Sequence, residues 1–389
     1  MDNKFEKWSK KIGTWGMLFV FIVIICSLRI WEMILGTHID SENHENRALA
    51  EEPKLSINNF YTFPKSYTYY YNDRVPFRNS FVCLNSTIDY NIFQKTVDER
   101  VIIGLDHWLY YTDAEDGDPI GCYQGTNLFS EEQLQTIAQN CLNIQEYLKG
   151  EGKEFVLYIV PDKTRIYYEF LPTRYGLPAE NNKVMQLYDY LNDNTDLRVV
   201  YPIKELYEAK NQRRENIYCK ADTHWNSIGA YVGAVALLKE LGITIPDIYD
   251  NTIMIRKGEN IAGDLADLLN LSEQFKKYDT DYIIEGYNEH NCEELEMDFR
   301  EKYVFRAEGG DTRKIYMIRD SFATAMAYYI GSQFNDSYMR YKGTYTYNDY
   351  LEQDPDIIVY ETTERYVDGL LDFSFWEQDQ ENNSVIKVD

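Results

Sequence analysis

Ser321 has the setting of a catalytic nucleophile. It follows an apolar segment over residues 314–318 that is typical of a buried strand, and small residues that suit the start of a helix come next. A serine hydroxyl on such a turn projects outward, and backbone N–H groups at the start of the helix can stabilise an oxyanion. Because a serine in this position can also simply cap the helix, Ser321 alone does not establish a catalytic site.

Asp222 and His224 supply the other two groups of a Ser-His-Asp site. Residues two apart in an extended segment point to the same side, so the Asp222 carboxylate can orient the His224 imidazole while the other ring nitrogen takes the serine proton. The alternative is a hydrogen-bonded loop histidine beside an aspartate that caps the next helix. Of the other histidines beyond the N-terminal region, His107 falls in a predicted hairpin turn and His290 in an acidic stretch. We therefore expect His224 to be the base.

Other chemistries find little support in the composition. The formal net charge of −25 leaves no basic field for a nucleic-acid backbone. Neither H-x-x-x-H nor H-E-x-x-H occurs, and both Gly-rich nucleotide loops are absent. Six irregularly spaced cysteines without a C-x-x-C motif fit neither a zinc site nor a dense disulfide framework, although one or two disulfides stay open. We expect no cofactor, no metal and no nucleic-acid partner.

The N-terminus has the pattern of a membrane anchor. Four lysines among residues 1–11 precede an apolar run over residues 12–28, and further apolar residues extend it. This pattern predicts a cytoplasmic tail and then a transmembrane helix over residues 12–36, with the rest of the chain outside the cytoplasm. No small-residue cleavage site follows closely, which favours a retained anchor over a signal peptide. The protein would be a single-pass protein of the cell membrane with an extracellular or periplasmic catalytic domain.

The elements that must position the three residues form an α/β pattern. Residues 37–100 are polar and punctuated by proline, and they are expected to form a stalk that packs onto a domain over residues 101–389. Alternating strands and helices predict a doubly wound parallel sheet, in which ligands bind at the carboxyl ends of the strands. Strands are predicted at 101–104, 108–111, 155–160, 198–201, 314–318 and 356–360, and helices at 130–150, 181–191, 203–212 and 228–241. Residues 245–302 break this alternation and are predicted to be an inserted cap.

Motifs along most of the chain resemble the SGNH-hydrolase-like family that contains the alginate O-acetyltransferases AlgJ and AlgX, also called DHHW proteins. The family's name motif here reads Asp222-Thr223-His224-Trp225, with Thr223 in place of a histidine, and Arg319 stands where a glycine usually precedes Asp-Ser. The other matching residues are Glu45-Asn46-Arg47, Leu49-Ala50, Pro53, Asp73-Arg74, Phe77-Arg78, Gly104, Trp108-Leu109-Tyr110, Pro161-Asp162-Lys163, Tyr167, Leu171-Pro172, Asn226, Gly263-Asp264-Leu265, Asp320-Ser321-Phe322, Pro355-Asp356, Glu361, Glu364 and Arg365.

The resemblance implies a three-layer sandwich with a permuted triad: Asp222 orients, His224 is the base and Ser321 carries the acetyl group. It also implies a multi-pass membrane-bound O-acyltransferase as the acetyl donor and a polysaccharide as the acceptor. Four further residues in or beside the matching motifs are candidates for substrate contact, although turn formation or core packing would explain some of them equally well. They are Arg319, Trp225, Lys163 and Asp264. Glu361 and Arg365, four apart, are expected to form a structural ion pair.

Three functions remain open at this point. The first is a membrane-anchored O-acetyltransferase that acts on an exported polysaccharide through an acetyl-serine intermediate. The second is a carbohydrate O-acetyl esterase with the same triad, since the two differ in whether water is excluded at the second step. The third is a non-catalytic, carbohydrate-binding scaffold of a polysaccharide synthesis complex.

Overall fold

The computed structural model describes residues 15–23, 27, 34, 49–73, 75, 77–287 and 290–376. The chain divides into two compact units. One comprises residues 1–97 with 267–271, and the other comprises residues 98–266 with 272–389. The second unit therefore begins at residue 98, whereas the sequence analysis predicts that the domain begins at residue 101.

The expected membrane anchor falls mostly outside this description. Of residues 12–36, only 15–23, 27 and 34 are described, and Glu45-Asn46-Arg47 and Arg74 also lie outside the described residues. Within the described ranges, no helix is both long and apolar enough to cross a membrane. The anchor and its orientation stay predictions.

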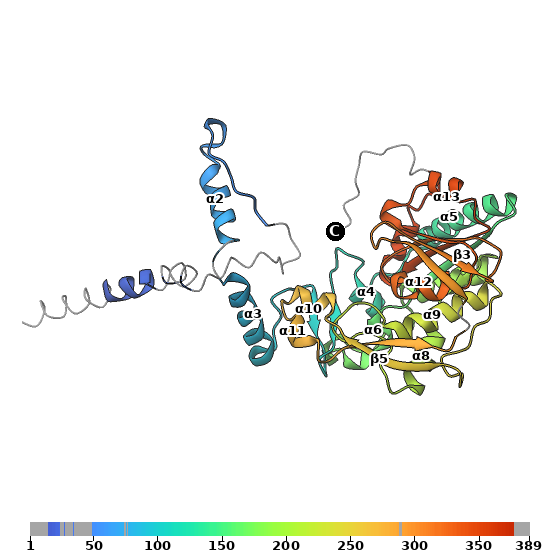
Figure 1. Ribbon diagram of the computed structural model, residues 1–389, viewed down its shortest axis with the longest axis horizontal. Coiled ribbons are helices and arrows are strands. Elements are labelled where there is room, and N and C mark those ends of the chain that lie inside the picture. Colours follow the sequence, from blue (N-terminus) through green and yellow to red (C-terminus); the bar gives the residue numbers. More distant parts are fainter. Residues whose placement is uncertain are drawn as a thin grey trace, which may run out of the picture. The chain divides into compact units, whose positions relative to one another are not determined.

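Short helices make up the described part of the first unit before residue 98. They are the 3₁₀ turn η1 (Ile57–Asn59), α2 (Phe63–Asn72), α3 (Arg78–Ile88) and the π turn η2 (Asp89–Phe93). α2 has Pro64 in its first turn, where the missing N–H removes no intrahelical bond. Figure 1 shows α2 and α3 as separate helices. Much of the expected stalk is thus helical, and its packing onto the domain stays a prediction.

A seven-stranded sheet forms the centre of the second unit, in the order β4-β3-β11-β9-β10-β8-β7. The strands β4, β3, β11, β9 and β10 run parallel, whereas β8 and β7 run antiparallel to their neighbours. The bounds are β3 (Glu154–Val160), β4 (Val199–Val200), β7 (Asn291–Met297), β8 (Lys302–Glu308), β9 (Ile315–Arg319), β10 (Ser337–Tyr341) and β11 (Ile357–Thr363).

The sheet is therefore mixed, which corrects the prediction of a parallel sheet. Only a short turn over residues 298–301 joins β7 to β8, and such a connection pairs neighbouring strands in antiparallel fashion. In β8, the buried residues Tyr303, Phe305 and Ala307 alternate with less buried ones. This alternation is typical of a strand with one face in the core, and it differs from the continuous apolar runs that predict the parallel strands.

Helices cover both faces of the sheet, so the predicted three-layer sandwich is confirmed (Figure 1). Alternate residues of β3 enter two separate cores: Val156, Tyr158 and Val160 pack with one set of helices, and Phe155, Leu157 and Ile159 pack with the other. The first set is α8 (Ile203–Gln212), α9 (Ser227–Glu240) and α12 (Ala323–Gly331). The second set is α5 (Glu131–Gly150), α7 (Lys183–Asn194) and α13 (Tyr347–Gln353).

The expected cap, residues 245–302, divides between two structures. β5 (Met254–Asn260) and β6 (Thr280–Glu285) form a separate antiparallel pair, with α10 (Asp264–Leu268) and α11 (Ser272–Phe275) between them in the sequence. From Asn291 onward the segment instead joins the main sheet as β7, because it pairs with β8. The predicted hairpin of β1 (Val101–Ile103) and β2 (Leu109–Tyr111) is confirmed.

Local capping signals predict several element ends well. α5 begins at a capping box in which Ser130 and Gln133 bond each other's backbone N–H, as predicted. The prediction for α8 matches its observed bounds.

The shorter elements are α4 (Pro119–Gln124), α6 (Lys163–Ile166), η3 (Tyr168–Phe170), η4 (Thr173–Tyr175), η5 (Lys342–Thr344) and η6 (Glu364–Leu370). Five described cysteines, Cys83, Cys122, Cys141, Cys219 and Cys292, are free thiols.

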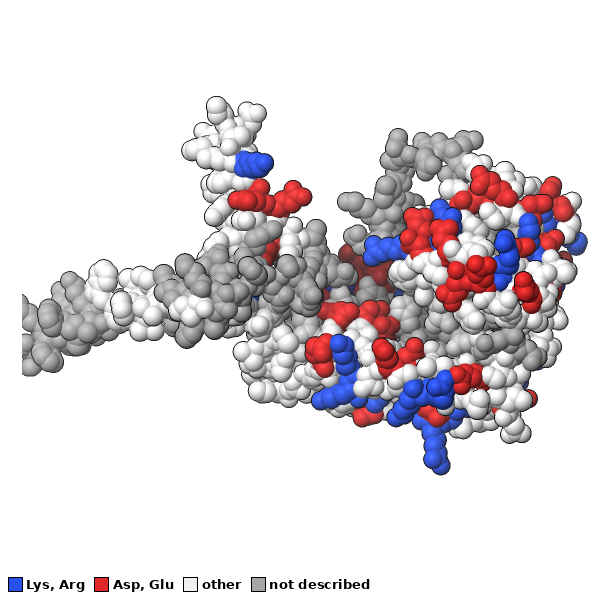
Figure 2. All heavy atoms as spheres, in the orientation of Figure 1, with Lys and Arg blue, Asp and Glu red and all other residues white. Residues whose placement is uncertain are grey.

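Charged side chains of both signs are mixed on the second unit. Figure 2 shows acidic and basic side chains interspersed over the visible face. Several form ion pairs, such as Arg313 with Glu154 at 2.9 Å and Arg198 with Glu240 at 2.8 Å. Some acidic side chains of the second unit therefore have a cation as a direct neighbour.

Candidate active site

The structure brings the three predicted triad residues into one hydrogen-bonded line. His224 Nε2 lies 2.8 Å from Ser321 Oγ, and His224 Nδ1 lies 2.6 Å from Asp222 Oδ1. The side chains of His224 and Asp222 are 28% and 20% exposed, so both are only partly buried. Asp222 Oδ1 also accepts the backbone N–H of His224 at 2.9 Å, which fixes the acid beside the ring. This arrangement can take a proton from the serine and hold the resulting imidazolium.

Residues 319–322, here called the nucleophile turn, connect β9 to α12 and present Ser321. The buried Asp320 carboxylate accepts hydrogen bonds from Phe322 N–H at 2.9 Å and from the N–H and hydroxyl of Thr363 at 2.8 and 2.7 Å. Burial opposes the charge of Asp320, but the Lys342 ammonium and these bonds hold its pKa below the usual value. The turn is thereby fastened to the end of β11.

Two backbone amides next to Ser321 are engaged within the protein. Phe322 N–H is bonded by Asp320, and Thr324 N–H donates to the Ser321 carbonyl at 3.1 Å. These two amides are therefore not free to meet a developing oxyanion. A tight turn needs its own amides to hold its shape, and this competing demand is not evident from the sequence.

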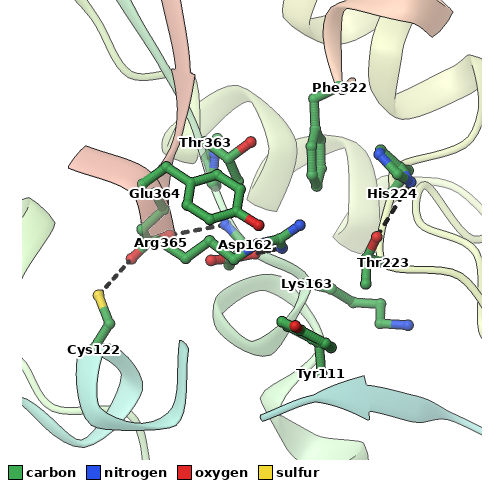
Figure 3. Close-up of polar contacts among 12 residues, drawn as sticks. Tyr111, Cys122, Asp162, Lys163, Thr223, His224, Phe322, Thr363, Glu364 and Arg365 are labelled. Atoms are coloured by element: carbon green, nitrogen blue, oxygen red, sulfur yellow. Dashed lines mark hydrogen bonds and ion pairs between the residues drawn. The ribbon is translucent and has the colours of Figure 1, made fainter. Parts of the chain in front are cut away.

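Residues 219–225, here called the base loop, carry Asp222 and His224. A bridge between Tyr218 and Trp225 closes the loop. The Lys163 ammonium donates to the carbonyl oxygens of Cys219, Lys220 and Asp222 at 3.1, 3.1 and 2.5 Å. In Figure 3, Lys163 is drawn below Thr223 and His224. Lys163 is 3% exposed, so it supports the loop from inside and does not reach toward a polymer.

Asp279 holds the opposite side of the base loop. Its carboxylate accepts the N–H groups of Lys220 and Ala221, both at 2.7 Å. Burial raises the pKa of Asp279, while those two bonds and the Lys163 charge favour its ionised form. Asp279 precedes β6 and carries no recognisable motif, so nothing in the sequence points to this role.

Asp264, which the sequence analysis offers as a substrate contact, lies beside the triad. Its Oδ1 and Oδ2 accept the Thr223 N–H and hydroxyl at 2.7 and 2.5 Å, and its own N–H donates to Asp222 Oδ2 at 2.9 Å. Thr223, the residue that departs from the family's name motif, therefore joins Asp264 to the base loop.

Trp225 and Arg319 face the interior. Trp225 is 2% exposed, and its Nε1 donates to the Phe322 carbonyl at 2.9 Å. Arg319 is fully buried, donates to the Phe299 carbonyl at 2.7 Å and stacks over the Tyr303 ring at 4.1 Å. Burial leaves neither side chain a surface for a sugar, which corrects their prediction as substrate contacts. The departure from glycine at position 319 is accommodated because the side chain turns into an aromatic pocket.

Arg365 pairs with Asp162 at 2.8 Å and not with Glu361. The expected partner, Glu361, instead accepts the Asp320 N–H of the nucleophile turn at 2.6 Å. The Arg365 guanidinium lies 5.5 Å from the Phe322 ring, which in turn lies 4.5 Å from the His224 ring. Figure 3 shows Phe322 between the Arg365–Asp162 pair and His224. A cation thus sits near the candidate site, and its Nε has no hydrogen-bond partner among the described residues.

The electrostatics of the triad suit a base held by an acid. Burial works against ionisation of Asp222, but its hydrogen bond to His224 and the imidazolium charge lower the pKa of Asp222 to about 2. Burial also opposes the charged form of His224, yet the hydrogen bond and charge of Asp222 and the charge of Asp264 outweigh it and raise the pKa of the ring. His224 is therefore poised to accept a proton.

Asp222, His224 and Asp264 also form a set of potential metal ligands among the described residues. Their donor atoms all lie within 4.8 Å of one another, and two carboxylates with an imidazole suit Zn²⁺. The oxygens of both acids already accept hydrogen bonds from the base loop and from the segment around Asp264. A cation would have to displace those bonds, so the arrangement fits an acid–base site better than a metal site.

The fold and the site together define a hydrolase-like α/β sandwich with a serine, a histidine and an aspartate in line. Residues 101–302 match the family model described as SGNH hydrolase-like domain, acetyltransferase AlgX, and the chain belongs to this family.

Curated relatives carry the name probable alginate O-acetylase AlgJ. The Pseudomonas putida protein is 26% identical over 212 residues, which are 53% of this chain and 51% of that protein. The Pseudomonas fluorescens protein is 24% identical over 179 residues, which are 46% of this chain and 42% of that protein. The chain thus spans about half the length of the curated relatives it matches.

Solved structures show a remote likeness. A DHHW family protein from Eubacterium siraeum is 16% identical with a TM-score of 0.47, over 58% of this chain and 84% of that one. PatB1 from Bacillus cereus, solved with a sulfonyl adduct, is 14% identical with a TM-score of 0.49, over 72% of this chain and 99% of that one.

Proposed function

We propose that this protein is an O-acetyltransferase that moves acetyl groups through an acetyl-serine intermediate. The observation that carries the proposal is the line from Asp222 through His224 to Ser321, with separations of 2.6 and 2.8 Å. Membership of the AlgX family supports acetyl transfer as the reaction class. The same line would support any acyl transfer, so the choice of acetyl rests on the family.

In the first half of the proposed reaction, His224 Nε2 takes the Ser321 proton as Oγ attacks the acetyl carbonyl. The leaving group departs with that proton and acetyl-Ser321 remains. In the second half, His224 deprotonates an acceptor hydroxyl, which attacks the ester and regenerates Ser321. Asp222 holds the imidazolium in both halves. Arg365 is the proposed source of positive charge for the oxyanion, because the Phe322 amide is already engaged.

The proposed setting is the outer side of the cell membrane. The lysines and apolar run at the N-terminus support a single-pass anchor with a cytoplasmic tail. The name of the curated relatives supports an exported polysaccharide as the acceptor. A multi-pass membrane-bound O-acyltransferase is the proposed acetyl donor, since acetyl must then cross the membrane to reach Ser321.

An esterase with the same residues is the second candidate. The His224 side chain is 28% exposed, so water can approach the base in the absence of an acceptor. Water in place of a sugar hydroxyl would release acetate from acetyl-Ser321.

The test uses a fluorophosphonate probe, which labels activated serines, together with the Ser321→Ala variant. We expect the full-length protein to be labelled and the variant not to be. Absence of labelling, or equal labelling of the variant, would refute both enzyme functions, and glycan binding without labelling would support the scaffold. Acetyl transfer from an artificial ester to added oligosaccharides supports the transferase, whereas release of acetate alone supports the esterase.

A further inference from the structure

A second carboxylate faces the ring nitrogen that Asp222 already bonds. Asp264 Oδ2 lies 3.8 Å from His224 Nδ1, compared with 2.6 Å for Asp222 Oδ1. The Thr223 hydroxyl contacts both groups, at 2.5 Å from Asp264 Oδ2 and 3.2 Å from His224 Nδ1. Nδ1 therefore has one acid in direct contact and a second one within reach through a hydroxyl.

The segment that carries Asp264 is built against the base loop. A Cβ at Gly263 would lie 2.1 Å from the Ala221 carbonyl oxygen, so only glycine permits this approach. The Ala266 N–H then donates to the same carbonyl at 3.1 Å, and the Asp264 N–H donates to Asp222 Oδ2. Backbone contacts on both sides of Asp264 thus fix the second carboxylate beside the first.

The two acids have different environments. The Asp264 side chain is 44% exposed and that of Asp222 is 20% exposed, so solvent screens Asp264 more strongly. The protein that surrounds the partly exposed Asp264 removes some of its hydration, and together with the negative charge of Asp222 this raises the pKa of Asp264. Asp222 is accordingly the stronger partner of the ring, and Asp264 adds a weaker field of the same sign.

We propose that Asp264 is an auxiliary positioning residue that shares with Asp222 the stabilisation of protonated His224, with Thr223 linking it to the ring. This inference rests on the proposed function, because it assigns Asp264 a part in the proton transfer from Ser321. Thr223 suits this role because its hydroxyl donates to Asp264, so its oxygen can accept the Nδ1–H bond that Asp222 takes in the wild-type protein once Asp222 is removed. When Asp222 is removed, Asp264 and Thr223 are the groups that remain to hold the ring.

The experiment compares four variants of the full-length protein: Asp222→Ala, Asp264→Asn, their combination, and Thr223→Val. The readout is the rate of fluorophosphonate labelling of Ser321 between about pH 5 and 9, a range that brackets histidine titration. Removal of a negative charge lowers the pKa of His224, so the ring stays neutral to lower pH. We therefore expect Asp264→Asn to move the acid limb of the profile to lower pH and to reduce the plateau rate about fivefold.

The double variant, Asp222→Ala with Asp264→Asn, gives the clearest test of whether the two acids share one role. Loss of the orienting acid costs about 10,000-fold in an ordinary triad. We expect Asp222→Ala to lose only about 100-fold here, because Asp264 remains, and the double variant to lose about 10,000-fold. The combined loss would then exceed the product of the single losses.

Matched variants separate this role from a structural one. Asp250 accepts the Thr252 N–H and hydroxyl at 2.9 and 2.8 Å in the same pattern, and it lies in an exposed turn. Asp250→Asn should leave the labelling profile unchanged. Thr223→Ser should retain the wild-type profile, whereas Thr223→Val should slow labelling as Asp264→Asn does. If Asp264→Asn unfolds, the comparison of Thr223→Ser with Thr223→Val still tests whether Thr223 connects Asp264 to the His224 ring.

Two outcomes would overturn the inference, and they differ from failure of the proposed function. One is an acid limb in folded Asp264→Asn that coincides with the wild-type limb. The other is a double variant whose loss equals the product of the single losses. Either result would leave Asp264 as a purely structural residue while Ser321 still reacts. If the wild-type protein itself is not labelled at Ser321, the proposed function fails and the inference fails with it.

Discussion

The nucleophile turn and the base loop are held in place in different ways. The nucleophile turn extends directly from β9, and its main support, Asp320, belongs to the turn and bonds the adjacent strand β11. The base loop is supported by side chains from three separate segments, namely Lys163 after β3, Asp264 at the start of α10 and Asp279 before β6. The nucleophile turn is thus held mainly through its own carboxylate and the strand beside it, whereas the base loop depends on side chains from several separate segments.

The largest expected effect tests how Asp320 supports the nucleophile turn. Asp320→Ala leaves the N–H groups of Phe322 and Thr363 and the Thr363 hydroxyl without an acceptor. We expect unfolding free energy to fall by about 3–5 kcal/mol and labelling of Ser321 to slow about 1,000-fold. Urea unfolding and probe labelling measure the two effects. Asp320→Asn keeps one acceptor oxygen, so its unfolding free energy and its labelling rate should lie between those of the wild-type protein and Asp320→Ala. Wild-type labelling in folded Asp320→Ala would show that the turn holds its shape without this carboxylate.

The second effect concerns Lys163, which supports the base loop from a distant part of the sequence. Lys163→Met removes the donor to three carbonyl oxygens of the base loop, and we expect about 1–3 kcal/mol of lost stability and about 50-fold slower labelling. Lys220→Met is the matched control, because Lys220 bonds the exposed Asp106 at 2.8 Å. The control should change stability by less than about 0.5 kcal/mol and leave labelling unchanged. Equal effects of the two substitutions would contradict a specific role of Lys163 in holding the loop.

The same difference explains what the sequence could predict. The strands β9 and β11 follow from continuous apolar runs, Ser321 follows from its place after the first of them, and Asp222 and His224 follow from their spacing of two. The strand β10 contains Ser337 and Arg340, has no continuous apolar run, and is missing from the prediction. Asp279 could not be predicted, because its partners are backbone amides of a loop about 60 positions away, and no side-chain pattern records them. The antiparallel strands β7 and β8 could not be predicted either, because β7 is exposed at nearly every position and β8 has one exposed face, so neither has a continuous apolar run.

A smaller effect should appear at alkaline pH. Burial lowers the pKa of Lys163 to about 8, although the charges of Asp279, Asp264 and Asp222 oppose this shift. Above that pH the neutral amine has two N–H donors for three carbonyl oxygens, so we expect labelling to slow about threefold between about pH 7.5 and 9.5. The unfolded chain holds this proton up to about pH 10.5, so Lys163 adds to the free energy of unfolding as pH rises between about 8 and 10.5. Lys163→Met should lack this alkaline limb, and its persistence there would assign the limb to another group.

The smallest effect concerns the direct link between the two segments. Trp225 belongs to the base loop, and its Nε1 donates to the Phe322 carbonyl of the nucleophile turn at 2.9 Å. Trp225→Phe keeps an aromatic ring but removes this donor, so His224 and Ser321 should lose alignment and labelling should slow about threefold. Trp108→Phe is the control, because Trp108 is equally buried and its Nε1 has no partner among the described residues. Both substitutions create a similar cavity, but Trp225→Phe also breaks a buried hydrogen bond, so it should lower the melting temperature further than Trp108→Phe. If Trp108→Phe slows labelling as much as Trp225→Phe, core packing and not the hydrogen bond keeps the base loop in register with the nucleophile turn.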